Sequence, residues 1–348
     1  MINRARLKDL RKIEDQRFLD AHPKSGELFT KAKESMPNGV PMSWMSKWPG
    51  AYPVFVEEAK GASFVDVDGN TYIDFCLGDT GSMTGHSPEP TVAAIREQVG
   101  RGLSAMLPTK DANFVSAELA KRFGLPLWQF TVSATDANRH VIRYSRLITR
   151  RKKIIVIDRC YHGSVDESFA TLDNQGNTVA REGNIGAPVE LDQTTRVVAF
   201  NNLDDMKSAL NHNDVAAILM EPAMTNVGIV LPQPGYLKAV EKLAKEFGAK
   251  LIIDETHTIS VGPGGMTAQE GLQPDFLTIG KAIGGGFPTG AFGMREEIAR
   301  SIKEMVELEV IDTGGVGGTL AANALSMAAM KATLTKVLTA ENFEKMLK

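Results

Sequence analysis

The sequence has few cysteines, no long apolar run and little excess charge of either sign. Its 348 residues include two cysteines, Cys76 and Cys160, and no CxxC spacing, so a zinc ribbon is not indicated and a reducing compartment is the default expectation. No apolar stretch approaches the roughly 18–20 residues that cross a membrane. A net charge of −3 argues against nucleic-acid binding. We therefore expect a cytoplasmic protein with neither a membrane nor a nucleic-acid partner.

A phosphate-binding loop of the ATPase type is also absent. The segment KLIIDETHTIS at residues 250–260 looks like an ATPase box, but that reading requires a Gly-Lys-Ser/Thr loop elsewhere in the chain. The candidate lysine, Lys281, follows a glycine but precedes Ala282. This excludes a nucleotide hydrolase of that class.

A metal site is the second reading of the same segment. Asp254, Glu255 and His257 are all possible ligands, but neighbouring residues of a strand point to opposite faces, so the three cannot easily share one ion. We expect no metal. A buried Asp254 instead needs a cationic partner, and the protonated ring nitrogen of a bound cofactor would supply one.

The pattern of apolar residues predicts an α/β fold. Helical periodicity continues to about Met36, and residues 53–75 then alternate as strands around an Asp-Gly turn. From about Pro88, helical segments alternate with short β-rich runs, which predicts crossover connections and a largely parallel sheet. The predicted strands are QFTVS, KIIVID, RVVAF, AAILMEP, KLIIDE, FLTIG and GAFGM.

Polar, titratable or small residues follow five of these predicted strands. In open parallel sheets, ligands bind beyond the carboxyl ends of the strands, so these residues should meet at one edge. They are Ser133-Ala134-Thr135, Tyr161-His162-Gly163, Glu221-Pro222, Asp254-Glu255 and Lys281.

Lys281 is the most unusual of them. It ends a predicted strand and comes shortly before three consecutive glycines, at positions 284–286, which indicate backbone lying where a Cβ would collide. A lysine in such a crevice, partly removed from water, offers its neutral amine to an aldehyde more readily than a surface lysine does.

Two other motifs have a functional and a structural interpretation each. The segment at residues 133–148 reads as a strand end, a small-residue turn and a helix, which would form an anion site at the helix N-terminus with the Thr135 hydroxyl. The alternative is a plain helix cap by Thr135 or Asp136. Tyr161 could stack on a planar ring, or it could be a tyrosine at the edge of the core.

A phosphate site, a stacking aromatic, a carboxylate for a ring nitrogen and a lysine for an aldehyde together describe pyridoxal 5′-phosphate (PLP). The sequence resembles the class III PLP-dependent aminotransferases of fold type I, nearest the glutamate-1-semialdehyde aminomutase and β-amino-acid aminotransferase branch. The segments LFTKAKESMPNGV, SATDAN, YHG, EPAMTNVG, LIIDE, TIGKAIGGGFPTGAFG and GGTLAANALSMAA occur in the family's order. The resemblance covers residues 28–330.

The resemblance implies a role for each of eight residues. Lys281 would form the internal aldimine and then move a proton, and Asp254 would pair with the pyridinium nitrogen. Ala134 and Thr135 would hold the phosphate, and Tyr161 would stack on the ring. The remaining cofactor-binding residues are Asn226 near the phenolic oxygen, Thr256 where a valine commonly packs on the ring, and Thr319 on the phosphate of a neighbouring subunit, which implies a homodimer.

The resemblance also predicts the domain plan. It implies a mostly parallel seven-stranded sheet with helices on both faces and a small N-terminal α+β segment. We expect residues 1–80 to form that segment, 81–330 the large PLP-binding domain, and 331–348 the start of a C-terminal lobe that is incomplete, since the sequence ends at Lys348.

Three functions are consistent with these features. The first is an aminotransferase that moves an amino group from an amino donor to a keto acid or aldehyde. The second is an aminomutase that moves the group within one molecule with the same residues. The third is a non-catalytic, PLP-binding dimeric relative or a fragment.

Overall fold

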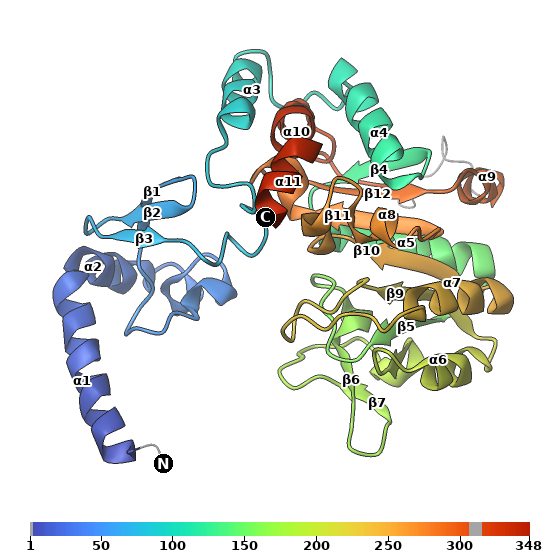
Figure 1. Ribbon diagram of the computed structural model, residues 1–348, viewed down its shortest axis with the longest axis horizontal. Helices are drawn as coiled ribbons and strands as arrows, with labels where there is room; N and C mark the ends of the chain where they lie inside the picture. Colours follow the sequence, from blue (N-terminus) through green and yellow to red (C-terminus); the bar gives the residue numbers. More distant parts are fainter. Residues whose placement is uncertain (1–2, 306–314) are drawn as a thin grey trace. The chain divides into compact units, whose positions relative to one another are not determined.

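The computed structural model describes residues 3–305 and 315–348, which fall into two compact units (Figure 1). The first unit consists of the chain up to Asp79 together with Gly85–Ser87. The second consists of Thr80–Thr84 and the chain from Pro88 onward. Among the helices of the described ranges, none is both long and apolar enough to cross a membrane.

The first unit pairs two helices with a small antiparallel sheet in the order β1-β2-β3. The turn between β2 and β3 is held by the buried Asp66, which accepts hydrogen bonds from the Asn70 backbone N–H at 2.8 Å and the Tyr72 hydroxyl at 2.8 Å. Gly69 in this turn has φ +89°, a conformation that favours glycine. The elements are α1 (Arg4–Ala21), α2 (Pro23–Ala32), β1 (Val56–Lys60), β2 (Ser63–Asp66) and β3 (Thr71–Ile73).

A seven-stranded sheet forms the centre of the second unit, in the order β4-β12-β11-β10-β9-β5-β8 (Figure 1). Strand β12 runs antiparallel to both its neighbours, and the pairs from β11 to β8 are all parallel. The mostly parallel sheet predicted from the sequence is therefore confirmed. The strands are β4 (Leu127–Thr131), β5 (Lys153–Ile157), β8 (Thr195–Val198), β9 (Val215–Met220), β10 (Lys250–Asp254), β11 (Phe276–Gly280) and β12 (Gly290–Met294). A two-stranded sheet, β6 (Ala170–Leu172) and β7 (Thr178–Ala180), lies outside it.

Helices of the second unit enclose this sheet with two apolar cores. Alternate residues of β11 divide between them, because side chains of a strand point to opposite faces. Phe276 belongs to the larger core, with residues of α5, α6, α7 and α9, whereas Leu277 and Ile279 belong to the smaller one, with α4, α10 and α11. The helices are α3 (Glu89–Val99), α4 (Lys110–Phe123), α5 (Ala134–Thr149), α6 (Leu203–Leu210), α7 (Tyr236–Phe247), α8 (Gly265–Gln269), α9 (Glu296–Met305), α10 (Ala324–Ala332) and α11 (Ala340–Leu347).

Close packing at the carboxyl end of the sheet depends on glycine. A Cβ on Gly290, the first residue of β12, would lie 2.3 Å from the carbonyl group of Ser133. A Cβ on Gly280, the last residue of β11, would lie 3.0 Å from the Cβ of Ala134. The two glycines therefore allow the start of α5 to lie directly against β11 and β12.

Candidate active site

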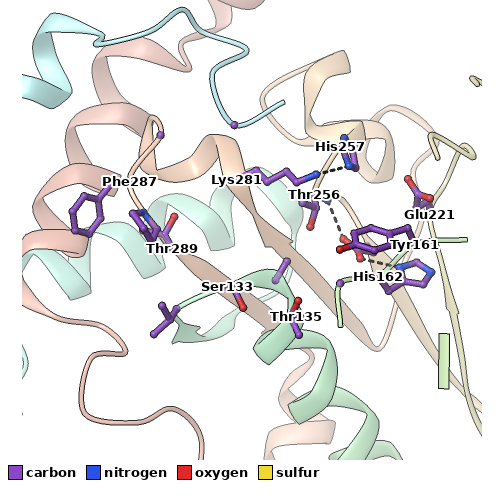
Figure 2. A pocket seen from close by; sticks show the side chains of 17 residues that line it. Ser133, Thr135, Tyr161, His162, Glu221, Thr256, His257, Lys281, Phe287 and Thr289 are labelled. Carbon is purple, nitrogen blue, oxygen red and sulfur yellow. Dashed lines mark hydrogen bonds and ion pairs between the residues drawn. The ribbon is translucent and has the colours of Figure 1, made fainter. Parts of the chain in front are cut away.

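A cavity of about 320 Å³ opens where the strands of the second unit end. Figure 2 shows its lining side chains, which come from the start of α5 and from the segments that follow β5, β9, β10 and β11. Six of the eight residues predicted from the sequence line this cavity: Ala134, Thr135, Tyr161, Asp254, Thr256 and Lys281.

The other two predicted residues lie elsewhere. Asn226 is exposed, and its amide donates a 3.3 Å hydrogen bond to the carbonyl of Arg159 instead of lining the cavity. Thr319 is also exposed, and it lines a separate cavity of about 640 Å³ together with Met106 and Leu107. Their proposed contacts with a cofactor stay predictions.

The start of α5 has features that could hold an anion. The first N–H groups of a helix have no partner within the helix, and the helix dipole makes this end positive. Ser133 caps the helix by accepting a 3.3 Å hydrogen bond from the Asp136 backbone N–H. Thr135 accepts another at 3.2 Å from the Ser164 backbone N–H. The predicted cap by Thr135 or Asp136 is therefore wrong, because Ser133 is the cap and Thr135 lines the cavity.

Asp254 is a buried carboxylate that keeps its charge. It accepts hydrogen bonds from His162 Nδ1 at 2.9 Å, the Asn138 amide at 3.0 Å and the Thr256 backbone N–H at 3.1 Å. Thr278 fixes Asn138 by donating a 2.7 Å hydrogen bond to its side-chain oxygen. Burial opposes ionisation, but His162 and these donors hold the pKa of Asp254 at about 2.

His162 is correspondingly cationic. Burial alone would lower its pKa, but the Cys160 sulfur and the Asp254 carboxylate raise the pKa of His162 well above its ordinary value. Asp254 is therefore ionised and forms an ion pair with His162, and both residues line the cavity.

Lys281 follows β11 and extends its amine into the cavity. Its backbone has φ +48°, a left-handed conformation that costs a residue with a Cβ about 1 kcal/mol or more. The side-chain amine lies 2.6 Å from His257 Nε2 (Figure 2). Lysine and carboxylate thus approach the same cavity from adjacent strands, since β10 and β11 are paired.

A family model described as aminotransferase class III matches residues 44–348. The chain belongs to the class III aminotransferases. Among curated class III relatives, the glutamate-1-semialdehyde 2,1-aminomutase of Roseiflexus castenholzii is 36% identical over 336 residues, which cover 93% of this chain and 74% of that protein. The protein of the same name from Methanocaldococcus jannaschii is 35% identical over 320 residues, covering 90% and 73%.

Solved structures of aminomutases and transaminases also resemble this class III chain. A glutamate-1-semialdehyde aminomutase from Pseudomonas aeruginosa PAO1 is 46% identical, with a TM-score of 0.94, covering 98% of this chain and 76% of that one. A lysine-to-alanine variant from the same organism was solved in complex with PMP. An omega-transaminase from Sphaerobacter thermophilus is 30% identical, with a TM-score of 0.82 over 92% of this chain and 74% of that one.

PLP is the cofactor of class III aminotransferases, so the predicted cofactor is confirmed at the level of the family. The side chains of this chain also fit such a group. Four buried polar atoms around the cavity have no hydrogen-bond partner among the described residues: Glu221 Oε1, His162 Nε2, Thr256 Oγ1 and Thr289 Oγ1. Because buried polar atoms are normally hydrogen-bonded, such atoms on side chains that line the cavity are consistent with a polar ligand there.

Glu221, one of these groups, has a raised pKa. It is 3% exposed, and burial raises the pKa of its carboxyl to about 7. One oxygen accepts a hydrogen bond from the Thr225 hydroxyl, and the other is the atom without a partner. A carboxyl that changes charge near neutral pH therefore lines the site.

Four residues of the site lacked a role in the sequence-based prediction: His162, Glu221, His257 and Thr289. The first two follow strands β5 and β9. The expectation that ligands bind beyond the carboxyl ends of strands therefore located them but gave them no function. His257 was discounted because alternation along a strand was extended to residue 257, but β10 ends at Asp254. Beyond that point the chain turns, and alternation no longer decides where a side chain points.

Proposed function

We propose that this chain is an aminomutase of the glutamate-1-semialdehyde 2,1-aminomutase type. The observation that carries the proposal is the likeness to several proteins of that name, at 34–36% identity for the curated relatives and 46% for the solved structure. The cavity supports it, because the lysine, the carboxylate and the helix N-terminus that PLP requires all line one space.

The residues of the cavity divide the binding of PLP between them. The N-terminus of α5, with Ala134 and Thr135, would hold the phosphate, and Asp254 would pair with the ring nitrogen. Tyr161 and Thr256 would lie against the ring. When bound, PLP supplies an aldehyde that takes up an amino group and a ring that accepts an electron pair from the adjacent carbon.

Lys281 is the residue proposed to act on both cofactor and substrate. Its amine would attach the cofactor covalently and, once released, would take a proton from one substrate carbon and return it elsewhere. Asp254 would assist this proton transfer, because a carboxylate that stays ionised keeps a nearby ring nitrogen protonated.

We further propose that the active form is a homodimer. Met106 and Leu107 are 72% and 73% exposed and line the same cavity as Thr319. Large apolar side chains gathered around a cavity commonly mark an interface. A second copy of the chain on this face would cover them and bring Thr319 toward the partner's phosphate site.

The decisive experiment supplies glutamate-1-semialdehyde alone, labelled with ¹⁵N. An aminomutase converts it, with no second substrate, into the isomer that carries the amine on carbon 1 and the ketone on carbon 2. The proposal expects an isomer formed in this way. Turnover that requires a separate donor and acceptor would instead establish the second candidate, an intermolecular aminotransferase, which the likeness to an omega-transaminase favours.

Binding of PLP without turnover of either kind would point to the third candidate, a non-catalytic relative. Absorbance of the lysine-bound cofactor, measured in the same sample, separates this outcome from a failure to bind.

A further inference from the structure

The amine of Lys281 lies in a chain of three polar groups. Its Nζ is 2.6 Å from His257 Nε2, and His257 Nδ1 is 2.7 Å from the Thr80 hydroxyl oxygen. Figure 2 shows His257 reaching the lysine from the segment after β10. All three residues belong to the second unit.

The contact between Lys281 and His257 constrains their protons. Two basic nitrogens at 2.6 Å form a hydrogen bond only when one of them offers a lone pair. Lys281 and His257 therefore cannot both be fully protonated. A protonated lysine is a donor only. With Lys281 protonated, His257 Nε2 is the acceptor, and the ring proton of neutral His257 lies on Nδ1, where it can donate to the Thr80 hydroxyl oxygen.

We propose that His257 is the proton acceptor and donor for Lys281, held in the required tautomer by Thr80; this rests on the proposed role of Lys281. A nucleophile, a base within hydrogen-bonding reach and a third group that orients the base are the signature of an activated nucleophile. Here the three positions are Lys281, His257 and Thr80. His257 would act on Lys281 and not on the substrate or the cofactor, so it is a positioning residue.

The proposed transfer between Lys281 and His257 moves a single proton. The Lys281 ammonium gives one proton to His257 Nε2, which leaves a neutral amine and an imidazolium. The Nδ1–H donates to the Thr80 hydroxyl oxygen both before and after the transfer, so neither side chain has to turn. The reverse transfer restores the ammonium. Thr80 therefore lowers the reorganisation that the proton transfer needs.

The test uses apoprotein, so that it does not depend on turnover. Rapid mixing with PLP and absorbance of the lysine-bound cofactor give the rate at which Lys281 captures an aldehyde. His257→Asn keeps a polar side chain but cannot take up a proton, and we expect it to slow capture about tenfold or more. His212→Asn, at an exposed histidine of the same unit, is the matched control and should capture PLP at the wild-type rate.

Thr80 provides a second, independent pair of variants. Thr80→Val removes the hydroxyl at nearly constant shape and should slow capture several-fold, whereas Thr80→Ser retains the hydroxyl and should restore the rate. A merely structural role for Thr80 would not separate these two. They also keep the proposal testable if His257→Asn does not fold.

A spectroscopic measurement addresses the tautomer directly. In ¹⁵N-histidine-labelled apoprotein, the ring nitrogens of His257 should report a proton on Nδ1, and Thr80→Val should shift the ring toward Nε2–H. A wild-type ring protonated on Nε2 alone, or capture by a folded His257→Asn protein within twofold of wild type, would overturn the relay. Wild-type apoprotein that never attaches PLP to Lys281 would contradict the proposed function itself.

Discussion

At the scale of single residues, the site is defined by carboxyls with opposite behaviour. Asp254 is buried yet ionised, because His162 and two amide groups donate to it. Glu221 is buried with one donor and is held near its titration midpoint at neutral pH. Burial raises the pKa of both carboxyls, and at Asp254 the donors together with the charge of His162 outweigh it.

We expect Asp254→Asn to depress turnover by orders of magnitude and to weaken cofactor binding. The amide fills the same space but carries no charge, so both the bound ring nitrogen and His162 lose the group that keeps them protonated. Steady-state kinetics and PLP titration measure the two effects. A variant within about twofold of wild type in both would remove Asp254 from its assigned role.

Glu221→Gln should change how stability depends on pH. The pKa of Glu221 is raised in the folded state to about 7, so the folded protein binds more protons than the unfolded chain between about pH 4.5 and 7. Stability conferred by the wild-type residue therefore falls as pH rises through this window, and the glutamine should relieve a cost of about 2–3 kcal/mol between pH 5 and pH 8.

The measurement is the thermal midpoint of apoprotein at both pH values. Asp254 titrates below this window because its pKa is lowered to about 2. A difference in midpoint that stays the same at pH 5 and pH 8 would show that Glu221 does not titrate there.

At the scale of elements, the proposed anion site depends on the loop after β5 lying against the start of α5. Gly163 has φ +77°, and a Cβ on it would lie 1.9 Å from the Thr135 hydroxyl oxygen. Because Gly163 has no Cβ, the loop lies close enough to α5 for the Ser164 backbone N–H to donate a hydrogen bond to the Thr135 hydroxyl oxygen. The position of Thr135 therefore depends on the absence of a side chain at Gly163.

Gly163→Ala and Gly176→Ala form a matched pair. Both positions have a positive φ, so both alanines lose about 1 kcal/mol to backbone strain, but a Cβ on Gly176 meets nothing within 4 Å. We expect Gly163→Ala to weaken PLP binding about tenfold or more, and Gly176→Ala to leave it unchanged. Equal PLP affinities in the two variants would show that the turn is not under steric control.

The strands and their ends could be predicted from the sequence because each buried strand is a short apolar run followed directly by polar residues. Lys281, Asp254 and Tyr161 were found in this way. His257 was not, because its position depends on where β10 stops, and nothing in KLIIDETH marks that point. Thr289 was not found either, because it lies before β12, the antiparallel strand, where the expectation that ligands bind beyond the carboxyl ends of strands does not apply.

At the scale of the whole molecule, the feature to test is the proposed homodimer. Thr319 and the exposed Met106 and Leu107 line one cavity, and this cavity shares no lining residue with the cavity around Lys281. If a second copy covers this face, then each phosphate site is completed only in the dimer.

Dilution should therefore weaken PLP binding. Thr319→Ala should reduce affinity by about 1.5–3 kcal/mol, the range for a hydrogen bond to a charged group. PLP titrations at several protein concentrations, beside analytical ultracentrifugation, measure both effects. A monomer that binds PLP as tightly as the dimer would contradict a shared site.

The most direct test of the central claim is to identify the lysine that holds the cofactor. Protein reconstituted with PLP is treated with borohydride, which fixes the cofactor on the amine that carries it, and digested peptides are analysed by mass spectrometry. The account predicts modification of the peptide that contains Lys281, and none at this site in Lys281→Ala, which should fold but lose the absorbance of lysine-bound PLP. Modification of another lysine alone, or wild-type turnover by Lys281→Ala, would contradict the account.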